Sequence, residues 1–222
     1  MYGMAHLFNY IGGIKMAYEF FNGNSAGIDN ISGNQYIELL EFCFQYSNYF
    51  SLTFLHPQSG TVNMRLGSEK MEQLDPYIYD SFETKDEPWY FEGPNATIKI
   101  FYNNEKTKQI ILDHTNSLYE WSTYEHRNPE DLSFFRSDGS VLFHLLEHEG
   151  LATIYNNDYE IVPEFALKTP WKSYNPDPDI IPLVYTAKRI KKQKLSIKQK
   201  TNFKKLVSQK NRPSRPGWKK KQ

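Results

Sequence analysis

The apolar residues of this chain recur with the periods of both helices and strands. In the segment 35–46 they stand three and four residues apart, which predicts an amphipathic helix. The positions concerned are Tyr36, Leu39, Leu40, Cys43 and Phe44. Phe and Leu alternate with Ser and Thr over 50–54, and ATIKIFY (96–102) alternates in the same way. Both patterns predict strands, and NEKTKQIILDH (104–114) predicts a second helix.

A Ser-Asp-Gly-Ser turn at 137–140 separates two apolar runs of similar length, DLSFFR (131–136) and VLFHLLE (141–147). Asp-Gly between two such runs is a strong local signal for a β-hairpin. LATIY (151–155) follows a glycine and predicts a further strand. The fold class that we expect is therefore α+β, with a small antiparallel sheet covered by helices.

Composition divides the chain into four regions. Residues 1–34 are expected to be a weakly structured prelude, and 35–165 an α+β globular domain. Residues 166–185 carry four of the 12 prolines and predict a linker or a strap across the domain. Residues 186–222 form a basic C-terminal tail, which we expect to be disordered or partly helical.

The formal net charge of zero hides a strong asymmetry along the chain. Residues 186–222 contain 15 Lys and Arg and no Asp or Glu, which leaves 11 basic and 26 acidic residues in 1–185. An acidic body joined to a basic tail indicates an anionic partner more directly than the overall balance does.

Several classes of function are disfavoured by what the sequence lacks. The single cysteine, Cys43, excludes an internal disulfide and a Cys-based zinc cluster. The apolar run 1–21 is interrupted by charged residues, so we expect no membrane span, and it lacks the features of a signal peptide. There is no glycine-rich phosphate loop. We therefore expect a cytoplasmic protein without a cofactor.

The segment 144–148 reads H-x-x-E-H, the zinc-ligand pattern of the inverted metallopeptidases. The pattern works on a helix, where His144 and His148 share a face and bind one Zn²⁺ while Glu147 activates the bound water. Such a helix would begin after Ser140. The Asp-Gly turn favours a strand instead, on which the two histidines form a surface pair or part of a binding face. We expect the strand and no metal, with a site at His144 and His148 as the alternative.

A second candidate cluster follows from the hairpin itself. A tight turn brings Pro129 close to His148, so that Glu130, Asp131, His148 and Glu149 gather at the open end of the hairpin. The cluster is either a solvated end with a His–carboxylate hydrogen bond, or an acid/base or metal pocket. No catalytic residue is assigned.

Four segments of this chain, 37–54, 88–102, 118–121 and 129–149, together resemble a small, poorly characterised family of Firmicutes proteins. Some of its members carry a stage III sporulation label. The resemblance covers about residues 35–155 and implies no activity. In the family pattern the pair that corresponds to His148-Glu149 recurs, whereas a histidine four residues earlier does not. The matching positions are Phe50, Ser51, Leu52, Trp121, Pro129, Glu130, Asp131, Leu132, Phe134, Phe135, His148 and Glu149.

The basic tail has the composition of a nucleic-acid-binding arm. Lysines release counterions when they neutralise phosphates, and an aromatic side chain can stack on an unpaired base. The residues expected to bind RNA or DNA are Lys188, Arg189, Lys191, Lys192, Lys204, Lys205, Arg212, Arg215 and Trp218. The alternatives are an acidic protein surface, the acidic body of the chain itself, a solubilising role, and an anionic membrane surface.

From the sequence we therefore expect a binding module that is not an enzyme, with a basic arm that contacts nucleic acid or an acidic partner. One alternative is a small metal-dependent hydrolase that uses the H-x-x-E-H motif. Another is an immunity- or sporulation-associated interaction protein.

Overall fold

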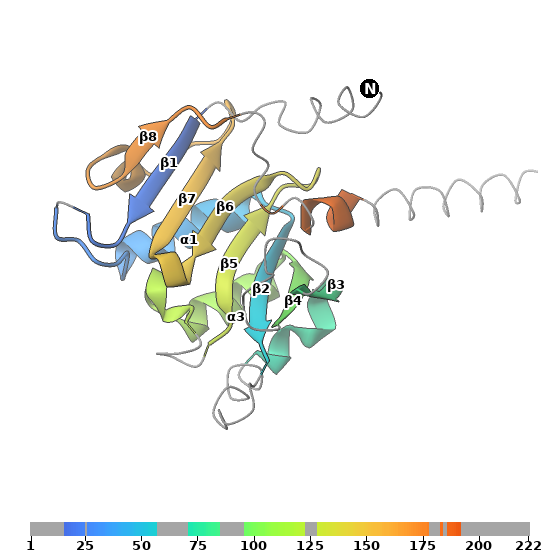
Figure 1. Cartoon of the computed structure of the whole chain (residues 1–222). Coiled ribbons are helices and arrows are strands. Elements are labelled where there is room, and N and C mark those ends of the chain that lie inside the picture. The colour runs from blue at the N-terminus through green and yellow to red at the C-terminus, as the bar shows by residue number, and fades with distance from the viewer. Residues whose placement is uncertain are drawn as a thin grey trace, which may run out of the picture.

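The computed structural model describes residues 16–24, 26–56, 71–84, 96–122, 128–177, 183 and 186–191. Within these ranges eight strands form one antiparallel sheet in the order β3-β4-β2-β5-β6-β7-β1-β8, with few helices (Figure 1). The α+β class expected from the sequence is confirmed at this level. The strands are β1 (Met16–Phe21), β2 (Tyr49–Leu55), β3 (Ile78–Glu83), β4 (Ala96–Tyr102), β5 (Glu130–Phe135), β6 (Val141–Leu146), β7 (Leu151–Asn156) and β8 (Lys172–Tyr174).

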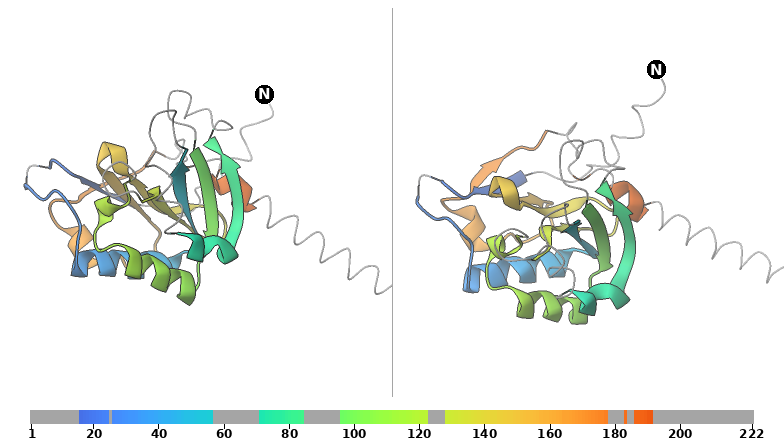
Figure 2. Two further views of the ribbon diagram at one scale, coloured as in Figure 1. Left: turned by 90° about the horizontal axis from the view of Figure 1, so that it is seen from below. Right: turned by 60° about the horizontal axis from the view of Figure 1, so that its bottom comes forward.

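Two α-helices lie on one side of the sheet, as Figure 2 shows. They are α1 (Asn34–Tyr46) and α3 (Glu105–His114); the short helices are η1 (Glu72–Tyr77), η4 (Leu118–Glu120), η5 (Glu147–Glu149) and η6 (Glu164–Leu167). The apolar positions that predicted α1 are buried. Phe44 packs its ring 5.9 Å from that of Phe50 on β2 and 5.0 Å from that of Phe134 on β5. The main core therefore lies between α1 and this face of the sheet.

Helix α3 begins where the sequence predicts because Asn104 caps it. The Asn104 side chain accepts hydrogen bonds from the backbone N–H groups of Lys106 and Thr107, and the Thr107 hydroxyl accepts one from the Asn104 N–H. This reciprocal capping box satisfies donors that a helix start otherwise leaves unpaired.

Strands β5 and β6 form the predicted hairpin. Ser133 pairs with His144 and Phe134 with Phe143, and one residue of register is lost close to the turn. Gly139 occupies the turn with φ +87°, a left-handed conformation that favours glycine. The Asp-Gly signal was therefore sufficient to place both strands.

Two strands come from regions in which the sequence predicts little regular structure. β1 lies in the expected prelude, and its Ala17 and Phe20 side chains are fully buried. It pairs with β7 on one side and with β8, from the proline-rich region, on the other.

The first residues of the basic tail are packed on the body. Residues 186–191 are helical, and the side chains of Ala187 and Ile190 are buried. Ile190 contacts the second apolar cluster, which includes Ile98, Ile100, Phe135 and Val141. Residues 192–222 lie outside the described part of the chain. Among the described helices, none has the length and apolar character needed to cross a membrane.

Candidate functional site

A row of mostly small polar side chains crosses the sheet on the face turned away from α1. Ser51, Ser133, His144, Thr153 and Glu19 lie on β2, β5, β6, β7 and β1, and each is the direct partner of the next. Successive side chains along a strand point to opposite faces. The neighbours of these residues along the chain form the core beneath α1, so the polar row faces the other way. The side chains of the two serines and the threonine are buried.

Hydrogen bonds fix the tautomer of His144. The Ser133 hydroxyl donates to the carbonyl oxygen of Asp131 at 2.9 Å, and His144 Nδ1 lies 2.9 Å from the same Ser133 Oγ. A hydroxyl carries a single hydrogen, so both bonds form together only when Nδ1–H of His144 donates. Burial, with a smaller contribution from His148, lowers the pKa of His144 to about 4. The imidazole is therefore neutral at pH 7, with its lone pair on Nε2.

The H-x-x-E-H segment is not a helix. His144 lies on β6, and the short helix η5 (Glu147–Glu149) begins after that strand ends. The expected strand is confirmed as far as Leu146, but His148 is not on it, so the two histidines do not lie on one strand face as expected. Because the segment makes no α-helical turn, His144 and His148 do not share a helical face as they do in a peptidase of this type, and a mechanism on that pattern has no geometric support.

Three of the four residues expected at the open end of the hairpin do come together. One potential ligand atom from each of Glu130, Asp131 and His148 lies within 4.8 Å of the other two. The two carboxylates are buried, each residue 5 % exposed, whereas the His148 side chain is 53 % exposed. Glu149 is outside the group; its Oε1 lies 3.9 Å from His148 Nε2, on the solvent side.

A β-bulge explains how consecutive residues reach one point. Ser51 pairs with Ser133 but Thr53 pairs with Glu130, so β5 has one residue more than β2 across this interval. Asp131 adopts φ +54°, which is uncommon for a residue other than glycine. The extra residue interrupts the alternation that would otherwise send the Glu130 and Asp131 side chains to opposite faces.

The loop that carries His148 is held at both ends. At its start, the Glu147 N–H donates to Asp131 Oδ1 at 3.3 Å. At its end, the Gly150 carbonyl oxygen accepts from the Tyr119 hydroxyl at 2.6 Å and from the Asn22 N–H at 2.9 Å. The position of His148 is thus tied both to the cluster and to the core.

The described part of the basic tail is a joint between arm and body. Arg189 Nη1 lies 3.6 Å from Asp80 Oδ2, and its guanidinium stands 4.1 Å from the Phe82 ring centroid. The Tyr79 hydroxyl donates to the Ile190 carbonyl oxygen at 2.8 Å. Lys188 and Lys191 are exposed on the same helix. The remaining candidate nucleic-acid-binding residues, Lys192, Lys204, Lys205, Arg212, Arg215 and Trp218, lie outside the described residues.

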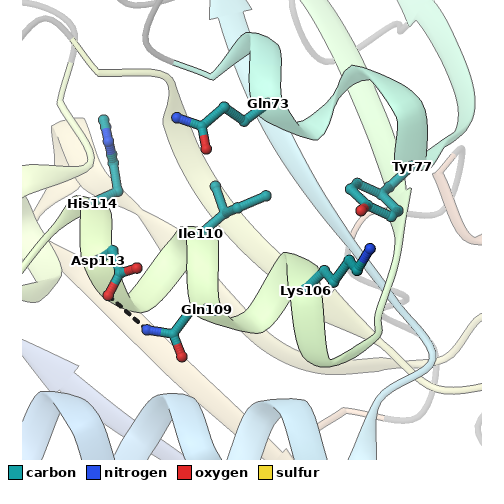
Figure 3. Close-up of a pocket in the computed structure, with 7 residues that line it drawn as sticks. All are labelled: Gln73, Tyr77, Lys106, Gln109, Ile110, Asp113 and His114. Atoms are coloured by element: carbon teal, nitrogen blue, oxygen red, sulfur yellow. Dashed lines mark hydrogen bonds between the residues drawn. The ribbon is translucent and has the colours of Figure 1, made fainter.

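An open pocket of about 550 Å³ lies between η1 and α3. Figure 3 shows Gln73 and Tyr77 of η1 across from α3; on the side of that helix away from η1, Gln109 Nε2 donates to Asp113 Oδ1 at 2.7 Å. Its remaining lining residues are Lys106, Ile110 and His114. Sequence analysis did not identify this pocket, nor the polar row. The signal for the row was the small polar residues inside otherwise apolar strands.

No family model matches this chain, and neither the curated proteins nor the solved structures yield a match. The resemblance to the Firmicutes family therefore stays a prediction from sequence.

Proposed function

We propose that this protein is a nucleic-acid-binding module whose basic arm, residues 186–222, is anchored on the folded body. The observation that carries the proposal is the packing of residues 186–191. The arm starts from a fixed point beside β3 and is not a freely attached tail. A fixed start lowers the conformational entropy that is lost when the arm binds its ligand.

Most of the basic charge of the arm lies beyond the anchor. Of the basic residues in 186–191, Arg189 is used in the joint, through Asp80 and Phe82. After residue 191 the chain has 12 further Lys and Arg and still no Asp or Glu. A charge density of this kind binds phosphates by counterion release and produces affinity that falls steeply with salt.

The composition of the arm favours nucleic acid over an acidic protein. Trp218 is flanked by lysines and by a Pro-Gly pair, and Phe203 precedes Lys204-Lys205. Aromatic rings between cationic side chains suit unpaired bases, on which each stacked ring contributes about 1–3 kcal/mol. An acidic polypeptide offers carboxylates without these flat apolar surfaces.

The test is a truncation placed by the structure. A chain ending at residue 191 keeps Ala187 and Ile190 in the core but loses the rest of the arm, whereas a chain ending at 185 would also remove the anchor. We expect the full chain to bind labelled RNA or DNA oligonucleotides in fluorescence anisotropy. Its log affinity should fall with log salt by about 0.7 for each phosphate contacted on a single strand. The 1–191 chain should lose this binding while its melting temperature stays unchanged.

Two further measurements separate the alternatives. Trp218→Ala should weaken oligonucleotide binding without changing the salt slope, because stacking involves no counterion release. Poly-glutamate serves as the acidic-protein probe. If it competes as well as the oligonucleotide does, and Trp218→Ala has no effect, the partner is an acidic protein and not nucleic acid.

A further inference from the structure

We propose that Glu130, Asp131 and His148 form a binding site for one divalent transition-metal ion, of the Zn²⁺ or Mn²⁺ class, where β5 begins and η5 follows β6. This inference concerns a different part of the molecule from the arm and does not depend on the proposed function.

The distances suit a shared ion. Ligand atoms that coordinate one metal at about 2.1 Å lie roughly 3–4 Å from each other. The three candidate atoms are already within 4.8 Å of one another, so a closure of about 1 Å would bring all three within coordinating distance of one ion. Rotation of the half-exposed His148 side chain can supply this movement without displacing its anchored backbone, while Glu130 and Asp131 are held in the sheet.

The three proposed ligands differ in burial in a way that suits an ion site. The two carboxylates are buried close together, where the attraction of a divalent cation for both is weakly screened. The His148 imidazole is the solvent-facing member of the group, with 53 % of its side chain exposed. Two oxygens and one imidazole nitrogen favour Zn²⁺ or Mn²⁺ over Mg²⁺ and Ca²⁺, which prefer oxygen ligands alone.

The groups around the cluster orient it. Asp131 Oδ1 accepts the Glu147 N–H, so this carboxylate has the kind of supporting hydrogen bond that typically positions a metal ligand. The Asp131 carbonyl oxygen accepts the Ser133 hydroxyl, which in turn fixes the His144 ring.

A second histidine lies next to the site and points independently to a ligand. His144 Nδ1 lies 2.9 Å from Ser133 Oγ, whose hydroxyl donates to the carbonyl oxygen of the proposed ligand Asp131, and among the described residues no hydrogen bond uses His144 Nε2. A neutral imidazole whose Nδ1–H is already donated presents Nε2 as a lone pair, which is the form that binds metals.

The experiment uses the full chain, freed of metal with a chelator that is then removed, and titrated calorimetrically with Zn²⁺, Mn²⁺, Mg²⁺ and Ca²⁺ in the absence of nucleic acid. We expect one equivalent of Zn²⁺ or Mn²⁺ to bind and to raise the melting temperature. His148→Ala should weaken that binding by more than about tenfold, since even supporting residues cost 10–100-fold. Glu130→Gln and Asp131→Asn should do the same while preserving the shape of each side chain.

His56→Ala is the matched control. His56 is also a half-exposed histidine beside a carboxylate, with its Nε2 3.4 Å from Glu83 Oε2, but it belongs to no three-residue group among the described residues. The His56→Ala variant should bind metal as the wild type does. Because the His148 side chain is exposed, His148→Ala should fold, and circular dichroism checks this. The test therefore remains decisive even if a carboxylate variant fails to fold.

Three results would overturn the site. They are no binding by the wild type, wild-type affinity in His148→Ala, and an equal loss in His56→Ala. Tight Mg²⁺ binding that is insensitive to His148→Ala would equally remove the imidazole from the proposal.

Discussion

Arg136 and Glu160 form a fully hydrogen-bonded ion pair inside the protein. Arg136 Nε donates to Glu160 Oε1 at 2.5 Å, and Nη2 donates to Oε2 at 2.7 Å. Two of the other guanidinium hydrogens reach the carbonyl oxygens of Val141 and Tyr155, a third reaches Ser140 Oγ at 3.4 Å, and the Asn157 N–H donates to Glu160. The pair thereby connects the β5–β6 hairpin, β7 and the loop after β7.

Removing one partner of this pair should be costly because it leaves a buried charge without its counterion. We expect Glu160→Ala to lower the free energy of unfolding by about 3–5 kcal/mol, measured by urea denaturation. The exposed pair Glu164–Lys168 is the control, and Lys168→Ala should cost less than about 1 kcal/mol. A loss of similar size in both variants would contradict the special role of the buried pair.

His144 should make stability depend on pH. Its folded pKa of about 4 lies below the ordinary 6.5, so the unfolded chain takes up a proton at a pH where the folded chain does not. The contribution of His144 to the free energy of unfolding is therefore fully present above pH 6.5. It decreases as the pH drops toward 4, by at most about 3 kcal/mol. Urea unfolding between pH 7 and 4.5, with chelator present, should show a smaller decline in His144→Gln than in the wild type. Identical declines would contradict this assignment.

At the residue scale, the sequence predicted the positions of side chains that depend on neighbouring residues in the chain. A two-strand register was enough to bring Glu130, Asp131 and His148 to one end of the hairpin. The bulge at Asp131 was not predictable from its neighbours, because it arises from pairing with β2, far away in the sequence. The exposed position of Glu149 depends on η5, which the expected strand through residue 147 did not include.

At the scale of elements, the turn of the β5–β6 hairpin packs closely against residues 186–191 at Gly139. A Cβ on Gly139 would lie 2.8 Å from the Ala187 carbonyl oxygen, which belongs to the backbone and cannot move aside cheaply. Gly27 has a similar φ, +65°, but nothing within 4 Å of its would-be Cβ.

The two glycines allow backbone strain to be separated from docking. Gly27→Ala should lower the free energy of unfolding by about 1 kcal/mol through the left-handed conformation alone. Gly139→Ala should cost about 1–3 kcal/mol more because it also displaces residues 186–191. Hydrogen exchange should rise at 186–191 in Gly139→Ala only. Equal unfolding energies in both variants would show that the contact contributes little.

Elements defined by their own periodicity were predictable, and those defined by distant partners were not. Helix α1 and the β5–β6 hairpin carry clear local signals. β1 has six residues, and its position depends on β7, more than 130 residues later in the chain. β8 has three residues and pairs only where β1 is already in place. For such short segments tertiary contacts, and not local propensity, decide the structure.

At the scale of the whole molecule, the acidic body and the basic arm meet at a joint that is mainly apolar. Ala187 and Ile190 are buried there, and the Arg189–Asp80 ion pair also contributes. Salt screens exposed charges more than it weakens apolar packing. The joint should therefore persist at salt concentrations that abolish arm binding to a polyanion, so that the two effects can be told apart in one titration.

Strand β8 has a further consequence for how copies of this protein meet one another. An open sheet presents unpaired N–H and C=O groups along its two outermost strands, and these invite association with a second chain. At one of these edges β8 offers three residues, all with exposed side chains, and it carries Lys172 between Pro170 and Pro176. A second copy could pair with only a short edge, which carries a charge and is limited by a proline on either side. Such an edge protects the sheet against growth into aggregates.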